Sequence, residues 1–420
     1  MVRIRSTVLL FSQIIILSSC QKTSEEAHLE LEQMNIPYNE NTFIDYVKKG
    51  DGYVVSLFLT AGINPDTRDE VEGETALILA ASEGHSDVIK ILVDNNADIN
   101  FAFGYGWTAL MEASYKGYTE IVKILLNTGA DPNAGGYSYR AIVLAAENGH
   151  YETIKLLLDK GADVDGKPCL YCDTALIGAA RNGYTEIVQL LIEKGANVNL
   201  TGSNDYTALI AASKNGHTEI VNLLLDKGAD VLWDTHIVES AIEMAAYSGH
   251  SDIVKILLHK GADPFEALVA AAFNGHFNVV QLLLDLGVDV NAKGKNFTAL
   301  TAATSKGHTD IVKLLLDRGA DPNTKGESDW TPLLWAVMDS HVDIVKLLLQ
   351  RGADMNAVDL GWTPLMRAAE NGHTENVQLL LDWGAQVNIK NEIGKTALNY
   401  AAENGHSKIV GLLKKAGGKQ

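Results

Sequence analysis

The stretch from Thr298 to Asn323 reads TALTAATSKGHTDIVKLLLDRGADPN, and close copies of it fill most of the 420-residue chain. The position that Thr298 occupies recurs twelve times, almost always at intervals of 32 to 34 residues, at Thr42, Thr75, Thr108, Arg140, Thr174, Thr207, Ser240, Glu266, Thr298, Thr331, Thr363 and Thr396. A unit repeated at a nearly fixed period predicts an elongated array in which each copy packs only on its neighbours. The length of the chain therefore indicates one array and not several compact domains.

Each copy divides into two helices and a connecting loop. Thr331-Pro332-Leu333 places a hydroxyl N-cap before a residue that suits the first helical turn. Gly372-His373 ends the first helix of its copy, because Gly adopts the left-handed conformation that a helix end requires. Thr374-Glu375 begins a second helix, whose closely spaced apolar residues predict neighbours on both sides. Gly-Ala-Asp then ends this helix and leads into a loop of about seven residues, the finger.

These signatures resemble the ankyrin repeat. The T-A/P-L, A-A, G-H, I-V, L-L-L and G-A-D-x-N elements recur from about residue 42 to 416. The resemblance implies an all-α solenoid of about twelve helix-turn-helix repeats joined by β-hairpin-like fingers. One departure is that the family's usual His after T-P-L is replaced by an apolar residue, at Ile78, Met111, Ile177, Ile210, Leu334 and Met366. The replacement removes a polar contact without affecting the fold.

The ends and the middle of the array, residues 42–420, are irregular. The first repeat, 42–74, has Gly50-Asp51-Gly52 in place of Gly-His, and the last, 396–420, stops without a finger, so both are expected to be caps. Between residues 228 and 266 one interval shortens to 26 residues, and Gly261-Ala262-Asp263-Pro264 leads straight into the next repeat. We expect a bend or a gap in the finger row there, which would separate two binding surfaces.

The charge of the chain excludes one class of partner. With 34 basic and 53 acidic residues the formal net charge is −19. Such a chain repels phosphate backbones, so no nucleic-acid partner is expected.

The first 20 residues differ from the rest. Arg3 and Arg5 precede a short apolar run, 8–17, which is typical of a signal peptide and too short for a membrane span. The following Leu-Ser-Ser-Cys resembles the lipobox of bacterial lipoproteins, which implies lipidation of Cys20 and anchoring to the cell envelope. Gln21 stands where some lipoproteins carry an Asp that retains them in the inner membrane, which favours the outer membrane, facing the periplasm. An ordinary secretory signal with an incidental Cys20 is the alternative.

Residues 21–41 are polar and acidic with no strong period, and we interpret them as a tether. A flexible chain of that length has an r.m.s. span of roughly 25 Å. The array would therefore stand clear of the membrane.

The residue types that serve as catalytic groups or metal ligands in other proteins do not form such a site in this sequence. Nine histidines occupy the same inter-helix position, and a catalytic group is not built in nine copies, so we predict structural hydrogen bonds. Cys169 and Cys172 supply only two of the four ligands that structural zinc requires, and in an oxidising compartment they predict a local disulfide. No catalytic residue, metal or cofactor is expected.

Aromatic residues give the strongest indication of a binding surface. Tyr and Trp bury much area at low entropic cost, which is typical of partner contacts. Finger packing is the alternative for residues directly before the Thr position. The predicted partner-binding residues, in fingers and near the ends of first helices facing a concave groove, are Phe103, Tyr105, Trp107, Tyr115, Tyr137, Tyr139, Tyr171, Tyr206, Tyr247, Phe273, Trp330 and Trp362.

Together these observations predict a non-enzymatic, monomeric scaffold, held at a membrane surface by its lipid, that binds a protein or peptide partner through finger tips and groove. Two alternatives stay open. In the first, the array is exposed at the cell surface and binds host or neighbouring-cell proteins. In the second, it is a periplasmic accessory to an oxidative-stress enzyme. An enzymatic role has no motif to support it.

Overall fold

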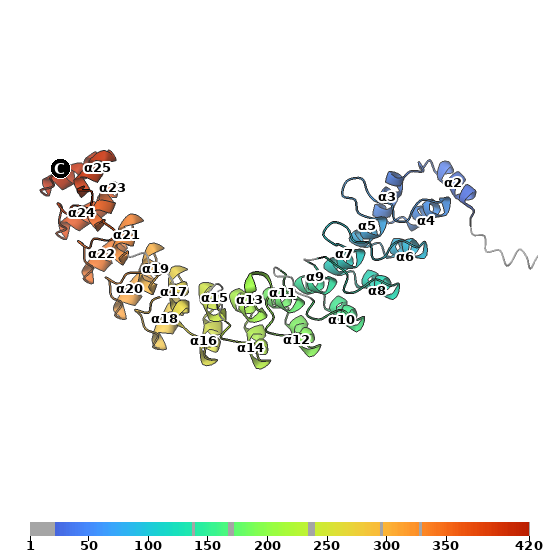
Figure 1. The fold of residues 1–420 in the computed structure, drawn as a ribbon, viewed down its shortest axis with the longest axis horizontal. Coiled ribbons are helices and arrows are strands. Elements are labelled where there is room, and N and C mark those ends of the chain that lie inside the picture. The colour runs from blue at the N-terminus through green and yellow to red at the C-terminus, as the bar shows by residue number, and fades with distance from the viewer. Residues whose placement is uncertain are drawn as a thin grey trace, which may run out of the picture. The chain divides into compact units, whose positions relative to one another are not determined.

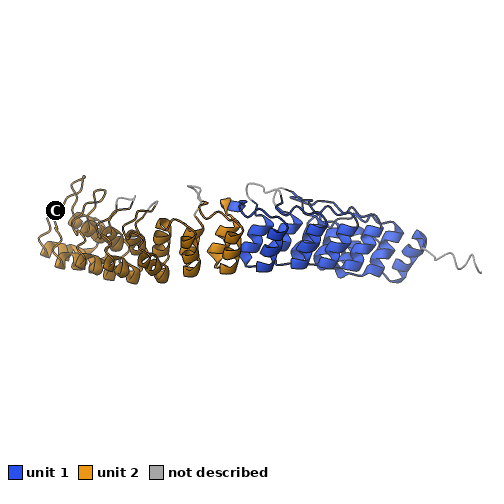
Figure 2. Cartoon of the chain, turned by 90° about the horizontal axis from the view of Figure 1, so that it is seen from below, with its two compact units in different colours: residues 1–204 blue, residues 205–420 orange. Residues whose placement is uncertain are grey.

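The computed structural model describes residues 22–136, 139–166, 172–233, 240–294, 297–326 and 330–419. These residues form 25 α-helices, a short 3₁₀ turn at Ser203–Asp205 and no strand (Figure 1). The all-α solenoid of helix-turn-helix repeats is thereby confirmed. Four fingers are closed by a single antiparallel bridge, at Arg68 and Thr75, Phe103 and Trp107, Lys293 and Thr298, and Asp359 and Trp362. The chain divides into two compact units, residues 1–204 and 205–420 (Figure 2).

Unit 1 contains an N-terminal helix, α2 (Ser24–Gln33), and five helix pairs. Its first helices pack in one row and its second helices in another. The first helices are α3 (Glu40–Lys49), α5 (Ala76–Glu83), α7 (Ala109–Lys116), α9 (Ala141–Glu147) and α11 (Ala175–Asn182). The second helices are α4 (Gly52–Ala61), α6 (Ser86–Asp94), α8 (Thr119–Asn127), α10 (Tyr151–Asp159) and α12 (Thr185–Glu193).

Unit 2 contains seven helix pairs in the same two-row arrangement. The first helices are α13 (Ala208–Asn215), α15 (Ala241–Tyr247), α17 (Phe265–Phe273), α19 (Ala299–Ser305), α21 (Pro332–Met338), α23 (Pro364–Glu370) and α25 (Ala397–Glu403). The second helices are α14 (Thr218–Asp226), α16 (Ser251–His259), α18 (Phe277–Asp285), α20 (Thr309–Asp317), α22 (Val342–Gln350), α24 (Thr374–Asp382) and α26 (Ser407–Lys415).

The repeat that begins at Thr298 shows why these residues form two helices. The Thr298 hydroxyl accepts the Thr301 N–H at 3.2 Å, and the Thr301 hydroxyl oxygen accepts the Thr298 N–H at 2.8 Å, which caps α19. Gly319 ends α20 with a φ of 91°, a conformation in which a Cβ is strained. Ile311, Val312 and other apolar residues of α20 are buried, because neighbouring repeats cover the helix on both sides.

The histidines at the inter-helix position tie each repeat to the one before it, as predicted. His150 Nε2 donates to the Tyr115 carbonyl at 3.0 Å, and His308 Nε2 donates to the Phe273 carbonyl at 3.0 Å. His85, His250, His276 and His406 make the same Nε2 contact to the preceding repeat, and His373 bonds the Val337 carbonyl of its preceding repeat through Nδ1. These rings hold the stack together and are not arranged as acid-base groups.

The N-terminal segment differs from the tether expected for residues 21–41. Residues 24–33 form α2, which packs on α4 and buries Ala27 and Leu31. The Thr23 side chain accepts the Glu26 N–H, and the Glu26 carboxylate accepts the Thr23 N–H, which caps the helix. Only two apolar residues face the core, so the period was too weak to detect in the sequence. The segment is a cap on the repeat stack.

The gap in the finger row is present. Helix α16 ends at His259 and α17 begins at Phe265, with Asp263 and Pro264 in place of a finger. Helices α15 and α17 pack directly against each other at this position. The bend expected around residues 228–266 stays a prediction, and residues 234–239 lie outside the described part of the chain.

Candidate partner-binding surface

The fingers lie along one edge of the helix rows in each unit (Figure 2), and asparagine side chains connect consecutive fingers. Asn323 Nδ2 donates to the Gly352 carbonyl at 3.2 Å, while its Oδ1 accepts the Asp354 N–H at 2.8 Å. Equivalent pairs of bonds join the repeats at Asn100, Asn133 and Asn291. Because each Asn satisfies two backbone groups of the next repeat, the finger bases are held in a fixed row.

The asparagine row is interrupted where the finger is missing. Leu232 and Phe265 occupy the Asn position of two successive repeats, and both side chains are exposed. A hollow of about 140 Å³ lies beside them, lined by residues that include Ile242, Glu243 and Asp263. The surface of unit 2 thus changes chemistry at this point.

In unit 1, three aromatic rings meet beside the fingers, and we call Trp107, Tyr115 and Tyr139 the Trp107 cluster. The Trp107 ring centroid lies 6.5 Å from that of Tyr115 and 5.5 Å from that of Tyr139, at interplanar angles of 66° and 75°. Trp107 Nε1 donates to the Glu112 carboxylate at 2.8 Å, which fixes the orientation of the indole. Tyr115 is 43% exposed and Tyr139 is 47% exposed, so two of the three rings are open to a partner.

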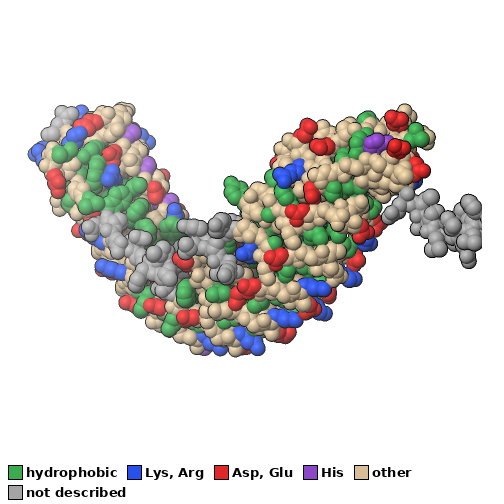
Figure 3. All heavy atoms as spheres, turned by 45° about the vertical axis from the view of Figure 1, so that its right-hand side comes forward, with side chains coloured by type: hydrophobic (Ala, Val, Ile, Leu, Met, Phe, Trp, Pro, Cys, Tyr) green, Lys and Arg blue, Asp and Glu red, His purple; other side chains and the backbone are tan. Residues whose placement is uncertain are grey.

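In unit 2, six rings form a continuous chain of contacts that we call the aromatic row. In order of contact they are Phe273, Phe297, Trp335, Trp330, Trp362 and Tyr400. The link between Trp330 and Trp362 is the Arg367 guanidinium, 5.4 Å from the first ring centroid and 3.7 Å from the second. Figure 3 shows hydrophobic side chains gathered toward the C-terminal end of unit 2.

Two N–H donors in the aromatic row have no acceptor. Trp335 Nε1 and Arg367 Nε are both inaccessible to solvent and have no hydrogen-bond partner among the described residues. An unpaired buried donor is unfavourable by about 1–3 kcal/mol. The row therefore combines apolar area with two buried donors that have no partner among the described residues.

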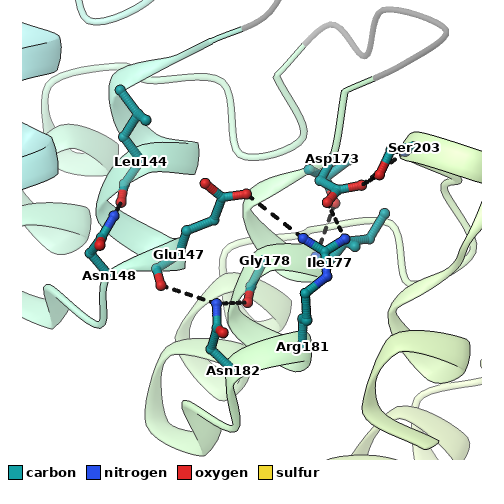
Figure 4. Close-up of polar contacts among 10 residues, drawn as sticks. Leu144, Glu147, Asn148, Asp173, Ile177, Gly178, Arg181, Asn182 and Ser203 are labelled. Atoms are coloured by element: carbon teal, nitrogen blue, oxygen red, sulfur yellow. Dashed lines mark hydrogen bonds and ion pairs between the residues drawn. The ribbon is translucent and has the colours of Figure 1, made fainter. Parts of the chain in front are cut away.

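Unit 1 also carries a buried carboxylate, Asp173, near a half-buried one, Glu147 (Figure 4). Asp173 accepts the Ser203 N–H at 2.8 Å, the Ser203 hydroxyl at 2.7 Å and the Arg181 guanidinium. The second guanidinium nitrogen of Arg181 lies 4.0 Å from Glu147. Gly178 allows this arrangement, because a Cβ there would lie 2.6 Å from Glu147 Cγ. Burial raises the pKa of Glu147, the Asp173 charge adds to the rise, and Arg181 opposes it.

A second carboxylate with a raised pKa lies near the Trp107 cluster. Burial raises the pKa of Glu74, and the negative charges of Glu112, Asp69 and Glu72 raise it further. Lys48 acts in the opposite direction. Aromatic rings and crowded carboxylates thus lie together on this face of unit 1.

A family model described as "Ankyrin repeats (3 copies)" matches residues 43–135, 142–232, 199–267, 242–326, 268–359, 324–391 and 359–420. These matches cover nearly all of the chain from residue 43 onward. The chain belongs to the ankyrin repeat family. No curated protein matches it as a relative. Ankyrin repeats are generally protein–protein interaction modules and are typically non-enzymatic, so the aromatic surfaces of this ankyrin repeat protein are candidate partner contacts.

The structure places the predicted aromatic residues of the ankyrin repeats in different settings. Trp107, Tyr115 and Tyr139 come together in unit 1, as do Phe273, Trp330 and Trp362 in unit 2. Tyr105 is 92% exposed, whereas Phe103 is half-buried beside it. Tyr206 donates to the Met244 sulfur at 3.4 Å, and Tyr247 is exposed. Tyr137 and Tyr171 lie outside the described residues.

Sequence reasoning missed Trp335, Arg367 and Tyr400. All three lie four residues after the Thr position of their repeats, on the first helix. The same position holds Glu112 and Gly178 in unit 1. The residue four positions after the Thr differs between repeats, whereas the residues on either side of it recur. This variation indicates a surface that differs between repeats.

Other predicted features of the ankyrin protein concern sites that the described residues cover only in part. Cys172 is disulfide-bonded, whereas Cys169 and Cys20 lie outside the described residues, so the pairing of Cys169 with Cys172 stays a prediction. Within the described ranges, no group of three or more His, Cys, Asp and Glu side chains could hold a metal ion. None of the helices in the part of the chain that the structure describes is long and apolar enough to cross a membrane.

Replacing Glu147 with Gln is expected to stabilise unit 1 at neutral pH. The raised pKa means that the folded state binds this proton more tightly than the unfolded state does, so the ionised carboxylate lowers stability above its folded pKa. Below the unfolded pKa of about 4.3 the carboxyl group is protonated in both states, and the difference should vanish. Urea unfolding of wild type and variant at pH 8 and at pH 4 measures the effect.

The matched control for this prediction is Glu193→Gln, because Glu193 is an exposed residue near the end of α12. It should change the urea midpoint by less than Glu147→Gln at pH 8. A Glu147→Gln variant less stable than wild type at pH 8 would show that the Arg181 contact outweighs the effect of burial.

Proposed function

We propose that this ankyrin repeat protein is a non-enzymatic scaffold that binds a protein or peptide partner through its fingers and first helices. The observation that carries the proposal is the aromatic row of unit 2, in which six rings and one guanidinium form a continuous contact chain. Trp, Tyr and Arg dominate the energetics of protein interfaces, because they combine large buried area with directed polar groups. The stacked helices hold the groups in place before a partner arrives, which lowers the entropic cost of binding.

We also propose that a lipid on Cys20 holds the scaffold at the bacterial outer membrane, facing the periplasm. Lys22 is the first described residue, and α2 begins at Ser24. The four-residue step from Cys20 to Ser24 spans at most about 14 Å. A lipidated Cys20 would therefore keep the N-terminal cap close to the bilayer surface. The fingers and first helices would then face a partner that is also in or near that membrane.

The test of both proposals is crosslinking in intact native cells, followed by purification of the full-length protein and identification of what is attached. The double substitution Trp330→Ala/Trp362→Ala should reduce recovery of the partner at least about tenfold, since interface Trp residues often contribute 2 kcal/mol or more. Cys20→Ser should move the protein from the membrane fraction to the soluble fraction.

Trp383→Ala is the matched control, because Trp383 is an exposed Trp of unit 2 at the end of the second helix α24, away from the aromatic row. It should leave recovery unchanged. Equal recovery with the double variant, shown by circular dichroism to be folded, would remove the aromatic row as the binding surface. Retention of the Cys20→Ser protein in the membrane fraction would remove the lipid anchor.

A further inference from the structure

We infer that the Trp107 cluster binds a basic side chain, Lys or Arg, of a peptide segment in the partner. The inference rests on the proposed function, because it assigns a chemistry to one part of the proposed binding surface. It follows from two independent features, the geometry of the three rings and the charge around them.

The rings form an open-sided box. Tyr115 and Tyr139 both stand at steep angles to Trp107, 66° and 75°. No ring contact joins the two Tyr residues among the described residues, so each Tyr contacts the indole separately. Cations bind to the faces of aromatic rings, most strongly to Trp, within about 6 Å of the ring centroid. A box of this kind presents several ring faces to one cationic group.

The indole that forms one side of the box is held rigidly. Its Nε1 hydrogen bond to Glu112 fixes the ring plane, and the Phe103–Trp107 bridge fixes the backbone. Among the described residues no cation lies over the Trp107 ring, whereas Lys116 lies 5.8 Å from the Tyr115 centroid. In the aromatic row of unit 2, by contrast, Lys306, Arg367 and Lys395 already lie over rings. Among the described residues, the Trp107 ring face is therefore not covered by a cation of the protein itself.

The charge around the box selects a basic partner. Glu112 is bonded to the indole itself, and the negative charges of Glu112, Asp69 and Glu72 all act on Glu74. The finger at residues 66–74 carries five acidic residues and one Arg, and together with Glu112 these acids outnumber the four basic residues of the region, Lys48, Arg68, Lys116 and Arg140. Crowded carboxylates repel one another, and a bound cation relieves that repulsion. An acidic or phosphorylated segment would meet the same charges and be rejected.

The test is isothermal titration of the full-length protein with three capped heptapeptides that differ only in charge. The probes are AKAKAKA, AQAQAQA and AEAEAEA, each blocked at both ends. The Lys peptide should bind more tightly than the Gln peptide, and the Glu peptide should not bind. Tyr115→Leu/Tyr139→Leu should weaken the Lys peptide by roughly tenfold, because each desolvated cation–π contact contributes a factor of about 3 to 30.

Two further variants keep the test decisive. Glu112→Gln removes one charge but leaves an acceptor for Trp107 Nε1, so it should weaken the Lys peptide without unfolding unit 1. Tyr53→Leu is the matched control, because Tyr53 is an exposed Tyr of unit 1 on the second helix α4, outside the Trp107 cluster. It should leave binding unchanged. Equal binding of the Lys peptide by all variants would show general acidic attraction only and would overturn the inference.

The inference and the proposed function can fail separately. If the Tyr115→Leu/Tyr139→Leu protein still captures the native partner while Trp330→Ala/Trp362→Ala does not, the scaffold function stands and the basic-side-chain site is wrong. If wild type captures no partner but binds the Lys peptide at the Trp107 cluster, the site stands and the proposed scaffold function is wrong.

Discussion

Replacing Gly117 with Ala is expected to destabilise unit 1 by about 2–4 kcal/mol, combining a left-handed backbone conformation with a steric clash. Gly117 ends α7 with a φ of 74°, and an added Cβ would lie 2.5 Å from ring atoms of His150. Relief of the clash would move the ring and weaken its 3.0 Å bond to the Tyr115 carbonyl. Urea unfolding followed by circular dichroism measures the loss, which should also broaden the transition as neighbouring repeats uncouple.

The control for Gly117 is Gly129→Ala. Gly129 also has a positive φ, 110°, but a Cβ there would meet no atom within 4 Å. The loss of stability in Gly129→Ala should be limited to the cost of a left-handed backbone at Ala, about 1–2 kcal/mol. Adding His150→Ala to Gly117→Ala should restore part of the lost stability, because the double variant removes the clash. If the two Gly variants lose the same stability and the double variant is additive, the His150 contact contributes nothing.

This contact illustrates what the sequence could predict. A Gly and a His that recur together at the same position imply a structural contact, and the structure shows the His of one repeat against the Gly of the previous one. The period, the helix caps and the missing finger could be predicted for the same reason, because each is a local signal compared across twelve copies. Repetition converts weak local signals into strong ones.

The features that could not be predicted are those that occur once. Helix α2 lies outside the period and buries few apolar residues, so the sequence did not predict that it packs on the array. Trp335 and Tyr400 lie at a position whose variation between repeats marks a differing surface, but the rings that they contact depend on how adjacent repeats stack. Buried carboxylates such as Asp173 and Asp359 resemble ordinary loop acids until their partners in another finger or repeat are known.

The two units share a scaffold but differ in surface chemistry. In unit 2 the rings of the aromatic row are paired with Lys306, Arg367 and Lys395. In unit 1 the indole of the Trp107 cluster bonds the Glu112 carboxylate, and Lys116 lies over Tyr115. Both patterns arise from a few variable positions on identical backbones, which is how a repeat array acquires different specificities without changing its fold.

Replacing Asp173 with Ala is expected to destabilise unit 1 by about 2–4 kcal/mol, because a buried carboxylate with several donors is removed. The Asp173 side chain is 7% exposed and accepts two bonds from Ser203 and one from Arg181. Without it, the Ser203 N–H loses its acceptor and Arg181 loses its ion pair with Asp173. Gly202 permits this close approach, since a Cβ there would lie 2.4 Å from the Asp173 carboxylate. Urea unfolding measures the loss, and hydrogen exchange at the Ser203 amide should become faster.

Two matched variants separate the causes. Asp173→Asn keeps an acceptor for Ser203 but loses the charge that pairs with Arg181, so about half of the loss is expected. Asp159→Ala removes an exposed carboxylate that lies 3.1 Å from Lys194, and it should change stability by less than about 1 kcal/mol. High salt should reduce the Asp159 effect more than the Asp173 effect, because buried pairs are screened less. If Asp173→Ala proves no more damaging than Asp159→Ala, the buried carboxylate does not hold the finger, and the rigidity of unit 1 must come from the helix rows alone.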